Sequence, residues 1–430
     1  MSAAASEIHP KTVRGVTRVA RNAKSAAAQL ATASTAEKNA ALQAIADGLR
    51  ANSAKILTAN EADLAAGEAN GLSAALLDRL SLSEERIEAI AASVEKVIDL
   101  DDPIGNIVVG RTLPNGIRLT QTRVPMGVIG AIYEARPNVT VDIAILSLKA
   151  GNATVLRGGS AAEKSNSEII AVLRRAVESA GLPADTVNGI DQYGREGASV
   201  LMNARDYVDL LIPRGGAELI NTVVQESIVP VIETGIGNVH MFIDSSATVK
   251  TAVDLVLNSK THRPSVCNSL ETLLVHEKAA KRVLPKILER LEAAGVVVHA
   301  DSDVAQLAPE SMKIRKVSRR DWAKEYLDLE LAVKIVTGID EAIDHIRAYT
   351  SGHTEVIVTK DIDNAETFVA GIDAAAVGVN VSTRFTDGGE LGFGAEVGIS
   401  TQKLHARGPM GVEQLTTTKW VMVGNGQVRL

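Results

Sequence analysis

Hydrophobic residues in the first 100 positions recur at the spacing of amphipathic helices. Leu42, Ile45 and Leu49 share one face of a helix, because three and four residues separate them. Segment 34–37 precedes them, with serine first and glutamate fourth, which is the spacing of a helix-capping box. Segment 81–84 repeats a serine–glutamate capping signal before a second apolar stripe. The pattern predicts a helical region over residues 11–100.

Two short apolar runs follow Pro103 and flank the pair Asn115-Gly116. An Asn-Gly pair in this setting is a strong signal for a β-hairpin, which is predicted over residues 104–125. The hairpin lies outside the main α/β pattern, and its exposed edges favour pairing with another subunit, although a local flap is an alternative. Segments 420–423 and 428–430 predict a further strand that returns to the hairpin.

From residue 127 to about residue 381, short apolar runs rich in branched side chains alternate with helical segments. This order predicts an α/β fold with two parallel-sheet domains and crossover helices. The strands of the first series are predicted at 128–132, 153–156, 208–212 and 229–232, with helices at 139–148, 161–180 and 217–226. The strands of the second series are predicted at 241–243, 270–275, 296–299, 333–336, 356–358 and 376–379. Glycines at 235 and 237 separate the two series, so we expect domains over 1–235 and 236–380, followed by a region over 381–430.

Composition narrows the classes of function. A chain of 430 residues with 46% apolar and 23% charged residues is typical of a globular protein with two or three domains. A net charge of −7 and 3% aromatic residues disfavour nucleic-acid binding. The single cysteine excludes an intrachain disulfide, and the eight histidines lack metal-binding spacing. The basic segment 11–24 is interpreted as a solvated helix rather than a transit peptide. With no apolar run near the roughly 20 residues that span a bilayer, we expect a cytoplasmic protein without metal or membrane partners.

Cys267 is the candidate nucleophile. A thiolate is the strongest nucleophile that a protein offers near neutral pH. Pro264 restricts the backbone just before it, and a predicted buried strand at 270–275 follows. The thiol is therefore expected on a rigid approach to a sheet, although an inert core cysteine is the alternative.

Two Arg-Gly-Gly turns follow predicted strands and precede predicted helices. Such turns let a backbone approach a phosphate, and a helix N-terminus favours an anion. Their residues are the candidates for cofactor binding: Arg157, Gly158, Gly159, Ser160, Arg214, Gly215 and Gly216. Together they suggest a dinucleotide across the strand ends, whereas each alone is equally well a plain turn. The glycines at 235 and 237 do not complete a Gly-x-Gly-x-x-Gly fingerprint, because position 240 is histidine.

Polar residues at two further places suit an anionic substrate. Asn138 is either a helix N-cap or a donor to an oxyanion, and Arg136 is a candidate for a substrate carboxylate or phosphate. The long, glycine-rich segment 380–411 carries Arg384, Lys403 and Arg407 as further candidates. A long structured loop of this kind is usually functional, although a solvated loop is the alternative.

Several of these stretches resemble the γ-glutamyl phosphate reductases, a family of the aldehyde dehydrogenase superfamily. The matching stretches are 125–130, 133–142, the two Arg-Gly-Gly turns, 263–268, 382–389 and 400–411. The resemblance implies an aldehyde-dehydrogenase-like fold with two Rossmann-like domains and a hairpin for oligomerisation at 104–125. In this fold 1–235 carries the N-terminal helices and the NADPH site, 236–380 the catalytic cysteine, and 381–430 a substrate loop and the return to the hairpin.

The resemblance also implies an activity and residue roles. NADPH would reduce L-glutamyl 5-phosphate to glutamate 5-semialdehyde, which is the second step of proline biosynthesis. The enzyme would be a homo-oligomer, and a glutamate 5-kinase could supply its acyl-phosphate substrate. Cys267 would be the nucleophile, Asn138 the oxyanion donor beside the backbone N–H of Cys267, and Glu325 a ligand of the nicotinamide ribose. The role of Glu233 stays open. The alternatives are an aldehyde-oxidising or CoA-acylating dehydrogenase and, more remotely, a non-catalytic nucleotide-binding scaffold.

Overall fold

The computed structural model describes residues 8–134 and 136–429, and the chain falls into two structural units. Unit 1 comprises Met1–Thr234, Gly392–Gly398 and Met410–Leu430, and unit 2 comprises Gly235–Leu391 and Ile399–Pro409. The chain first passes from one unit to the other at the glycine-rich segment that begins at residue 235. Residues 381–430 are divided between the two units.

The N-terminal region of unit 1 is helical, as the sequence predicts. A capping box begins α2 (Thr35–Ala51): the Glu37 N–H donates to Ser34 Oγ at 3.3 Å, and the Ser34 N–H donates to the Glu37 carboxylate at 2.7 Å. The apolar stripe of α2 is buried. The other helices of this region are α1 (Pro10–Leu30), α3 (Ser53–Ala69), α4 (Ala74–Leu80) and α5 (Glu84–Ile98).

A four-stranded parallel sheet in the order β5-β4-β3-β6 follows in unit 1. Its strands are β3 (Val128–Tyr133), β4 (Ala153–Arg157), β5 (Val187–Gly189) and β6 (Leu210–Arg214), and its helices are α6 (Pro137–Lys149), α7 (Glu163–Ser179), α8 (Gly194–Met202) and α9 (Ala217–Glu226). The central strand β3 is buried along its whole length, as is typical of a parallel strand covered on both faces. From β3 the chain adds β4 and β5 on one side and β6 on the other, so the strand order reverses between β3 and β6.

The strand predicted at 229–232 is wrong. This segment makes only an isolated bridge between Val231 and Leu211. Pro230 accepts the Leu211 N–H at 2.8 Å through its carbonyl but has no N–H of its own to continue a ladder. The short elements β5 and α8 are too brief to leave a periodic pattern in the sequence and were not predicted.

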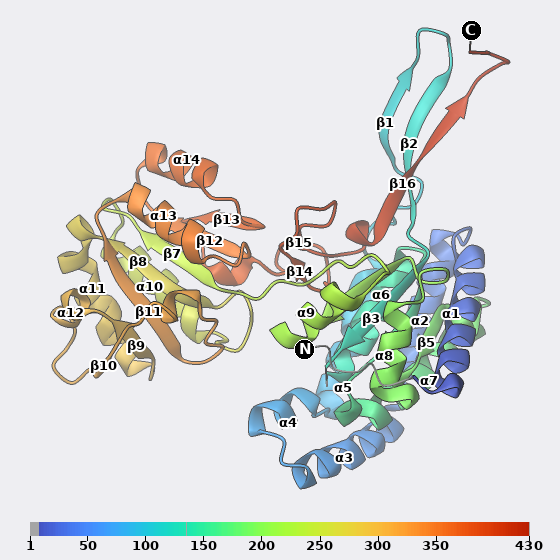
Figure 1. The fold of residues 1–430 in the computed structure, drawn as a ribbon, viewed down its shortest axis with the longest axis horizontal. Helices are drawn as coiled ribbons and strands as arrows, with labels where there is room; N and C mark the ends of the chain where they lie inside the picture. Colours follow the sequence, from blue (N-terminus) through green and yellow to red (C-terminus); the bar gives the residue numbers. More distant parts are fainter. Residues whose placement is uncertain (1–7, 135, 430) are drawn as a thin grey trace. The chain divides into compact units, whose positions relative to one another are not determined.

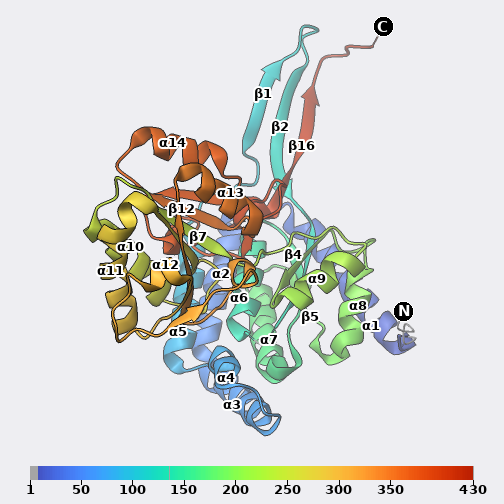
Figure 2. The same ribbon diagram turned by 60° about the vertical axis from the view of Figure 1, so that its left-hand side comes forward.

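The predicted hairpin is confirmed as part of a three-stranded antiparallel sheet in unit 1, with the order β1-β2-β16 (Figure 2). Its strands are β1 (Ile107–Thr112), β2 (Arg118–Pro125) and β16 (Thr416–Val423). Gly116 has φ +87° in the turn between β1 and β2, a conformation that glycine adopts without strain. The predicted return strand is thus confirmed at 420–423, whereas residues 428 and 429 are not in a strand and Leu430 lies outside the described residues. Apolar side chains are exposed on this sheet, among them Ile107, Trp420 and Met422.

Unit 2 is built on a seven-stranded parallel sheet in the order β10-β9-β11-β8-β7-β12-β13 (Figure 1). Its strands are β7 (Val239–Ile243), β8 (Leu270–His276), β9 (Val297–Ala300), β10 (Ile314–Lys316), β11 (Glu330–Val336), β12 (Thr354–Val358) and β13 (Ala376–Val379). Its helices are α10 (Val249–Thr261), α11 (Glu277–Ala293), α12 (Ser302–Ala305), α13 (Ile339–Tyr349) and α14 (Ile362–Gly371). Ile399–Ser400 and Gly408–Pro409 form a separate two-stranded pair, β14 and β15.

The alternation of side chains along each strand builds two hydrophobic cores in unit 2. On β7, Met241 and Ile243 join the cluster that contains α10 and α11, whereas Phe242 joins the cluster that contains α13 and α14. Successive side chains of a strand point to opposite faces of the sheet, so the sheet is covered on both faces. The six strands predicted for this part are confirmed, and β10 was missed. Among the described helices of the whole chain, none is long and apolar enough to cross a membrane.

Candidate active site

The one cysteine of the chain lies in a turn of unit 2 between α10 and β8. The Ser269 N–H donates to the Val266 carbonyl at 3.0 Å and closes this turn around Cys267, which is partly buried. Strand β8 begins at Leu270 and is buried along its length. The thiol is therefore carried by a turn fixed to a rigid strand, as the sequence predicts.

Asn268 joins the cysteine turn to a loop more than 100 residues away in the sequence. The side-chain amide of Asn268 donates to the Thr386 carbonyl at 2.8 Å, and the backbone carbonyl of Asn268 accepts from Thr383 Oγ1 at 2.7 Å. The Thr383 N–H donates to Ser259 Oγ, on α10, at 3.1 Å. The cysteine turn, the end of α10 and residues 382–386 thus form one hydrogen-bonded assembly.

Gly237 packs directly against the backbone of the cysteine turn. A Cβ atom on Gly237 would lie 1.6 Å from the Cys267 carbonyl oxygen, which is far closer than real atoms approach. The Gly237 N–H donates to Glu325 Oε1 at 2.7 Å. Burial raises the pKa of Glu325 above its usual value, while this N–H and the charge of Lys260 act in the opposite direction. Glu325 therefore holds the segment on which the Cys267 backbone rests.

Replacing Gly237 with alanine is expected to lower kcat by at least about tenfold, although the thiol is untouched. The new methyl group meets backbone atoms that cannot rotate away, so the cysteine turn must shift, and small misplacements of a reacting group are costly. Gly338→Ala is the matched control, because its added Cβ comes no closer than 4.0 Å to another residue. Steady-state kinetics and circular dichroism of both variants test this, and equal activity of the two variants would contradict it.

A fully buried ion pair supports the same region. Lys260 Nζ, at the end of α10, donates to Glu271 Oε2, on β8, at 2.9 Å, and both side chains are 0% exposed. The other oxygen of Glu271 accepts the Leu327 N–H at 3.3 Å, and Leu327 has φ +55°. Burial raises the pKa of Glu271 and lowers that of Lys260, since charged forms are disfavoured in a dry interior. The pair links α10, β8 and the loop that carries Glu325.

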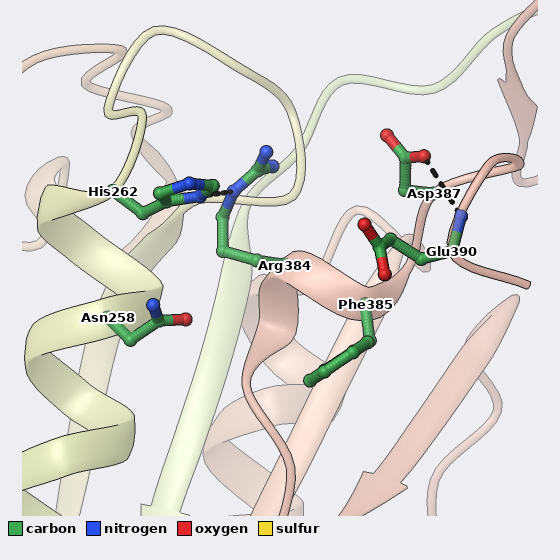
Figure 3. Close-up of a pocket in the computed structure, with 6 residues that line it drawn as sticks. All are labelled: Asn258, His262, Arg384, Phe385, Asp387 and Glu390. Atoms are coloured by element: carbon green, nitrogen blue, oxygen red, sulfur yellow. Dashed lines mark hydrogen bonds between the residues drawn. The ribbon is translucent and has the colours of Figure 1, made fainter.

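A cavity of about 220 Å³ opens beside this assembly (Figure 3). Its lining residues are Asn258, His262, Arg384, Phe385, Asp387 and Glu390. Arg384 Nε donates to His262 Nδ1 at 3.4 Å, and the guanidinium lies alongside the imidazole ring. Burial lowers the pKa of Arg384 from its usual value, whereas Asp387 and Cys267 act in the opposite direction. Arg384 and Cys267 are therefore close enough to interact electrostatically, and the guanidinium charge favours the thiolate.

The other two predicted substrate cations of the C-terminal segment are grouped elsewhere in unit 2. Lys403 Nζ and Arg407 Nη2 both form ion pairs with Asp373, the latter at 2.8 Å. These two cations lower the pKa of the Asp373 carboxyl, Lys403 most strongly. Neither cation lines the cavity that Arg384 lines.

The two Arg-Gly-Gly turns follow β4 and β6 in unit 1. Both lie at the carboxyl ends of strands that flank β3, where the strand order reverses, and this is where open α/β sheets bind ligands. Added Cβ atoms would lie 2.0 Å from the Asn166 side chain at Gly158 and 2.7 Å from the Glu134 side chain at Gly215. A side chain at Gly158 or Gly215 would therefore displace Asn166 or Glu134, and the position of the turns fits a dinucleotide.

Peptide groups in both turns already have acceptors. The Gly158 N–H donates to Asp191 at 2.7 Å, and the Gly216 N–H donates to Glu134 at 3.1 Å. Burial raises the pKa of Asp191 to about 6, although the Gly158 N–H and Arg157 favour its charged form. Arg157 Nε donates to the Gly194 carbonyl at 3.3 Å. These two N–H groups are therefore already engaged, and Arg157 and Arg214 are the positive charges of the two turns.

Asn138 is not a helix N-cap. Arg136 takes that position, because Pro137 occupies the first turn of α6, where its missing N–H is harmless. The Asn138 amide instead donates to Asp142 Oδ2, one turn along, at 3.1 Å. The amide nitrogen carries two hydrogens, so this hydrogen bond leaves one of them for a further acceptor. Ala135, in the same stretch, lies outside the described residues.

Sequence reasoning missed five of the six residues that line the cavity. They carry no motif of their own, although Phe385 and Asp387 lie in stretch 382–389, which matches the related family; the five are Asn258, His262, Phe385, Asp387 and Glu390. These residues come together only through the contact between α10 and residues 383–390, and no local sequence pattern predicts that contact. In the described part of the chain, no group of three or more histidine, cysteine or acidic residues could hold a metal ion.

Comparison with known proteins identifies the family. The model of the aldehyde dehydrogenase family matches residues 3–315. The γ-glutamyl phosphate reductase of Kineococcus radiotolerans is 55% identical over 413 residues, 96% of each chain, and that of Thermobifida fusca is 54% identical over 97% of this chain and 99% of its own. The crystal structure of γ-glutamyl phosphate reductase from Thermotoga maritima matches with a TM-score of 0.93 and 45% identity, over 97% of this chain and 100% of that chain.

The chain therefore belongs to the aldehyde dehydrogenase family and, within it, to the γ-glutamyl phosphate reductases. The predicted aldehyde-dehydrogenase-like α/β fold is confirmed. Members of this family are oxidoreductases that use nicotinamide cofactors.

Proposed function

We propose that this protein reduces L-glutamyl 5-phosphate with NADPH to L-glutamate 5-semialdehyde and phosphate, in the second step of proline biosynthesis. The observation that carries the proposal is the single thiol, Cys267, held in a fixed turn beside a cavity that the half-buried Arg384 lines. The names of the relatives supply the substrate and the reaction.

Cys267 would supply the nucleophile. Its thiolate attacks the carbonyl carbon of the acyl phosphate, the new C–S bond forms, and the C–O bond to phosphate breaks as phosphate leaves. NADPH, when bound, supplies the hydride that reduces the resulting thioester. The thiohemiacetal oxyanion then re-forms a carbonyl and expels the Cys267 thiolate. Both tetrahedral species carry an oxyanion, so the backbone N–H of Cys267 serves as a donor twice.

Residues of both Arg-Gly-Gly turns would hold the cofactor in this proposal. Arg157 and Arg214 would provide cations for its phosphates. Glu325, which binds the Gly237 N–H, is the proposed ligand of the ribose. Lys403, Arg407 and Arg136 remain proposed partners of the substrate's charged groups.

A spectrophotometric assay of the purified protein tests the proposed reaction. With glutamate 5-semialdehyde, the protein is expected to reduce NADP only when inorganic phosphate is added, because phosphate must release the acyl group from the thiol. NAD in place of NADP is expected to support a lower rate. Reduction that needs coenzyme A, or that proceeds with water alone, would instead support the acylating or the aldehyde-oxidising alternative.

The sheet formed by β1, β2 and β16 is the proposed surface for self-association. Ile107 is 63% exposed and Met422 68% exposed on this sheet, and large apolar side chains in such a position favour a second copy of the chain. A glutamate 5-kinase is the proposed supplier of the acyl phosphate.

A further inference from the structure

We infer that the cavity beside the cysteine turn binds the α-amino acid end of the substrate, with Arg384 on the α-carboxylate and Glu390, assisted by Asp387, on the α-ammonium group. This inference rests on the proposed function and adds to it the part of the site that selects an amino acid.

The position of the cavity connects it to the nucleophile. Arg384, Phe385 and Asp387 lie on the loop that Asn268 holds through the carbonyls of residues 384 and 386, at 3.5 and 2.8 Å. Asn268 directly follows Cys267 in the chain. Asn258 and His262 form the opposite wall and project from the end of α10 (Figure 3). A ligand in this cavity is therefore placed within one hydrogen-bonded assembly with the thiol.

Arg384 presents an unused donor. Its Nη1 atom is buried and has no hydrogen-bond partner among the described residues. A buried donor without a partner costs free energy, so the guanidinium is suited to receive an anionic group from a ligand. A carboxylate matches the planar guanidinium with two parallel hydrogen bonds.

The two acids of the cavity identify the second charge of the ligand. Asp387 Oδ1 accepts the Gly389 N–H at 2.9 Å, which fixes the turn that carries Glu390. In the described part of the chain, no hydrogen bond or ion pair involves the Glu390 side chain, which is exposed at the cavity. One cation and two carboxylates around a volume of about 220 Å³ suit a small zwitterion.

The same charges argue against phosphate in this cavity. A phosphate group carries up to two negative charges, and two neighbouring carboxylates repel it. An α-amino acid carries one carboxylate and one ammonium group, so each side of the cavity meets an opposite charge. The leaving phosphate is therefore assigned to other cations of the protein.

Two aldehydes that differ only in the amino group test the assignment. Glutamate 5-semialdehyde carries the α-ammonium group, whereas 5-oxopentanoate lacks it and keeps the carboxylate. For each enzyme, kcat/KM is measured for both aldehydes with NADP and phosphate. The measured quantity is kcat/KM for glutamate 5-semialdehyde divided by kcat/KM for 5-oxopentanoate. Glu390→Gln is expected to lower this ratio about tenfold or more, because a hydrogen bond between Glu390 and the charged α-ammonium group is lost. Asp387→Asn is expected to act in the same direction.

Arg384→Gln is expected to lower kcat/KM for both aldehydes, because both carry the carboxylate. Glu366→Gln, which changes an exposed acid on α14 outside the cavity, is the matched control and should leave the ratio unchanged.

An unchanged ratio in Glu390→Gln would overturn the inference. A lower KM for phosphate in that variant would also overturn it, since that result would place phosphate in the cavity. If the wild-type protein reduces NADP with neither aldehyde in the presence of phosphate, the proposed function itself fails.

Discussion

The Cys267→Ala variant is expected to lose at least about three orders of magnitude in kcat, because it lacks the atom that becomes acylated. The chain has no other cysteine to take over the reaction. The substitution removes one sulfur from a partly buried turn, so the surrounding hydrogen bonds of Asn268 should persist. Steady-state kinetics measure the loss, and NADPH titration by fluorescence should give a dissociation constant close to that of the wild type.

Loss of activity together with loss of NADPH binding would show only that the variant is misfolded. Cys267→Ser provides a second variant, since a hydroxyl keeps the volume but is a far weaker nucleophile near neutral pH. Residual activity above about one per cent in Cys267→Ala, with an intact fold, would contradict covalent catalysis at this position.

The Glu271→Ala variant is expected to lose about 3–5 kcal/mol of unfolding free energy. The substitution leaves the Lys260 ammonium group without its partner at a position that is 0% exposed, and an unpaired buried charge carries this cost. It also removes the acceptor of the Leu327 N–H. Urea unfolding followed by tryptophan fluorescence in a Trp420→Phe background measures the change, because Trp322 in unit 2 is then the only tryptophan.

Two further variants test whether the loss of stability in Glu271→Ala comes from the unpaired buried charge of Lys260. Lys250 and Asp254 form a solvent-exposed pair, with side chains 89% and 60% exposed, so Lys250→Ala should leave the unfolding free energy almost unchanged. The double variant Lys260→Met/Glu271→Leu removes both charges and should recover much of the lost stability. A cost for Glu271→Ala no larger than that for Lys250→Ala would contradict the account of this pair.

Elements with strong local signals could be predicted from the sequence. The capping box at Ser34 and Glu37, the Asn115-Gly116 turn and the apolar runs of the seven-stranded sheet all depend on residues close together in the chain. The strand predicted at 229–232 was wrong because its apolar side chains resemble a strand, whereas Pro230 lacks the N–H that a ladder needs.

The candidate site could be predicted only in part, because long-range contacts decide it. The position of Cys267 before a buried strand is a local feature, and the sequence shows it. Three other features are not local: Gly237 packed on the cysteine backbone, the pairing of Lys403 and Arg407 with Asp373, and the cavity between α10 and residues 384–390. Each joins segments that are tens to more than a hundred residues apart in the chain.

Transfer of the glutamyl group to Cys267 is the central step of this account. Wild-type protein is mixed with L-glutamyl 5-phosphate in the absence of NADPH, quenched in acid, digested and analysed by mass spectrometry. One glutamyl group should appear on the peptide that contains Cys267, and adding NADPH before the quench should remove it. A glutamyl group on any other peptide, or none at all while the enzyme turns over, would contradict the account.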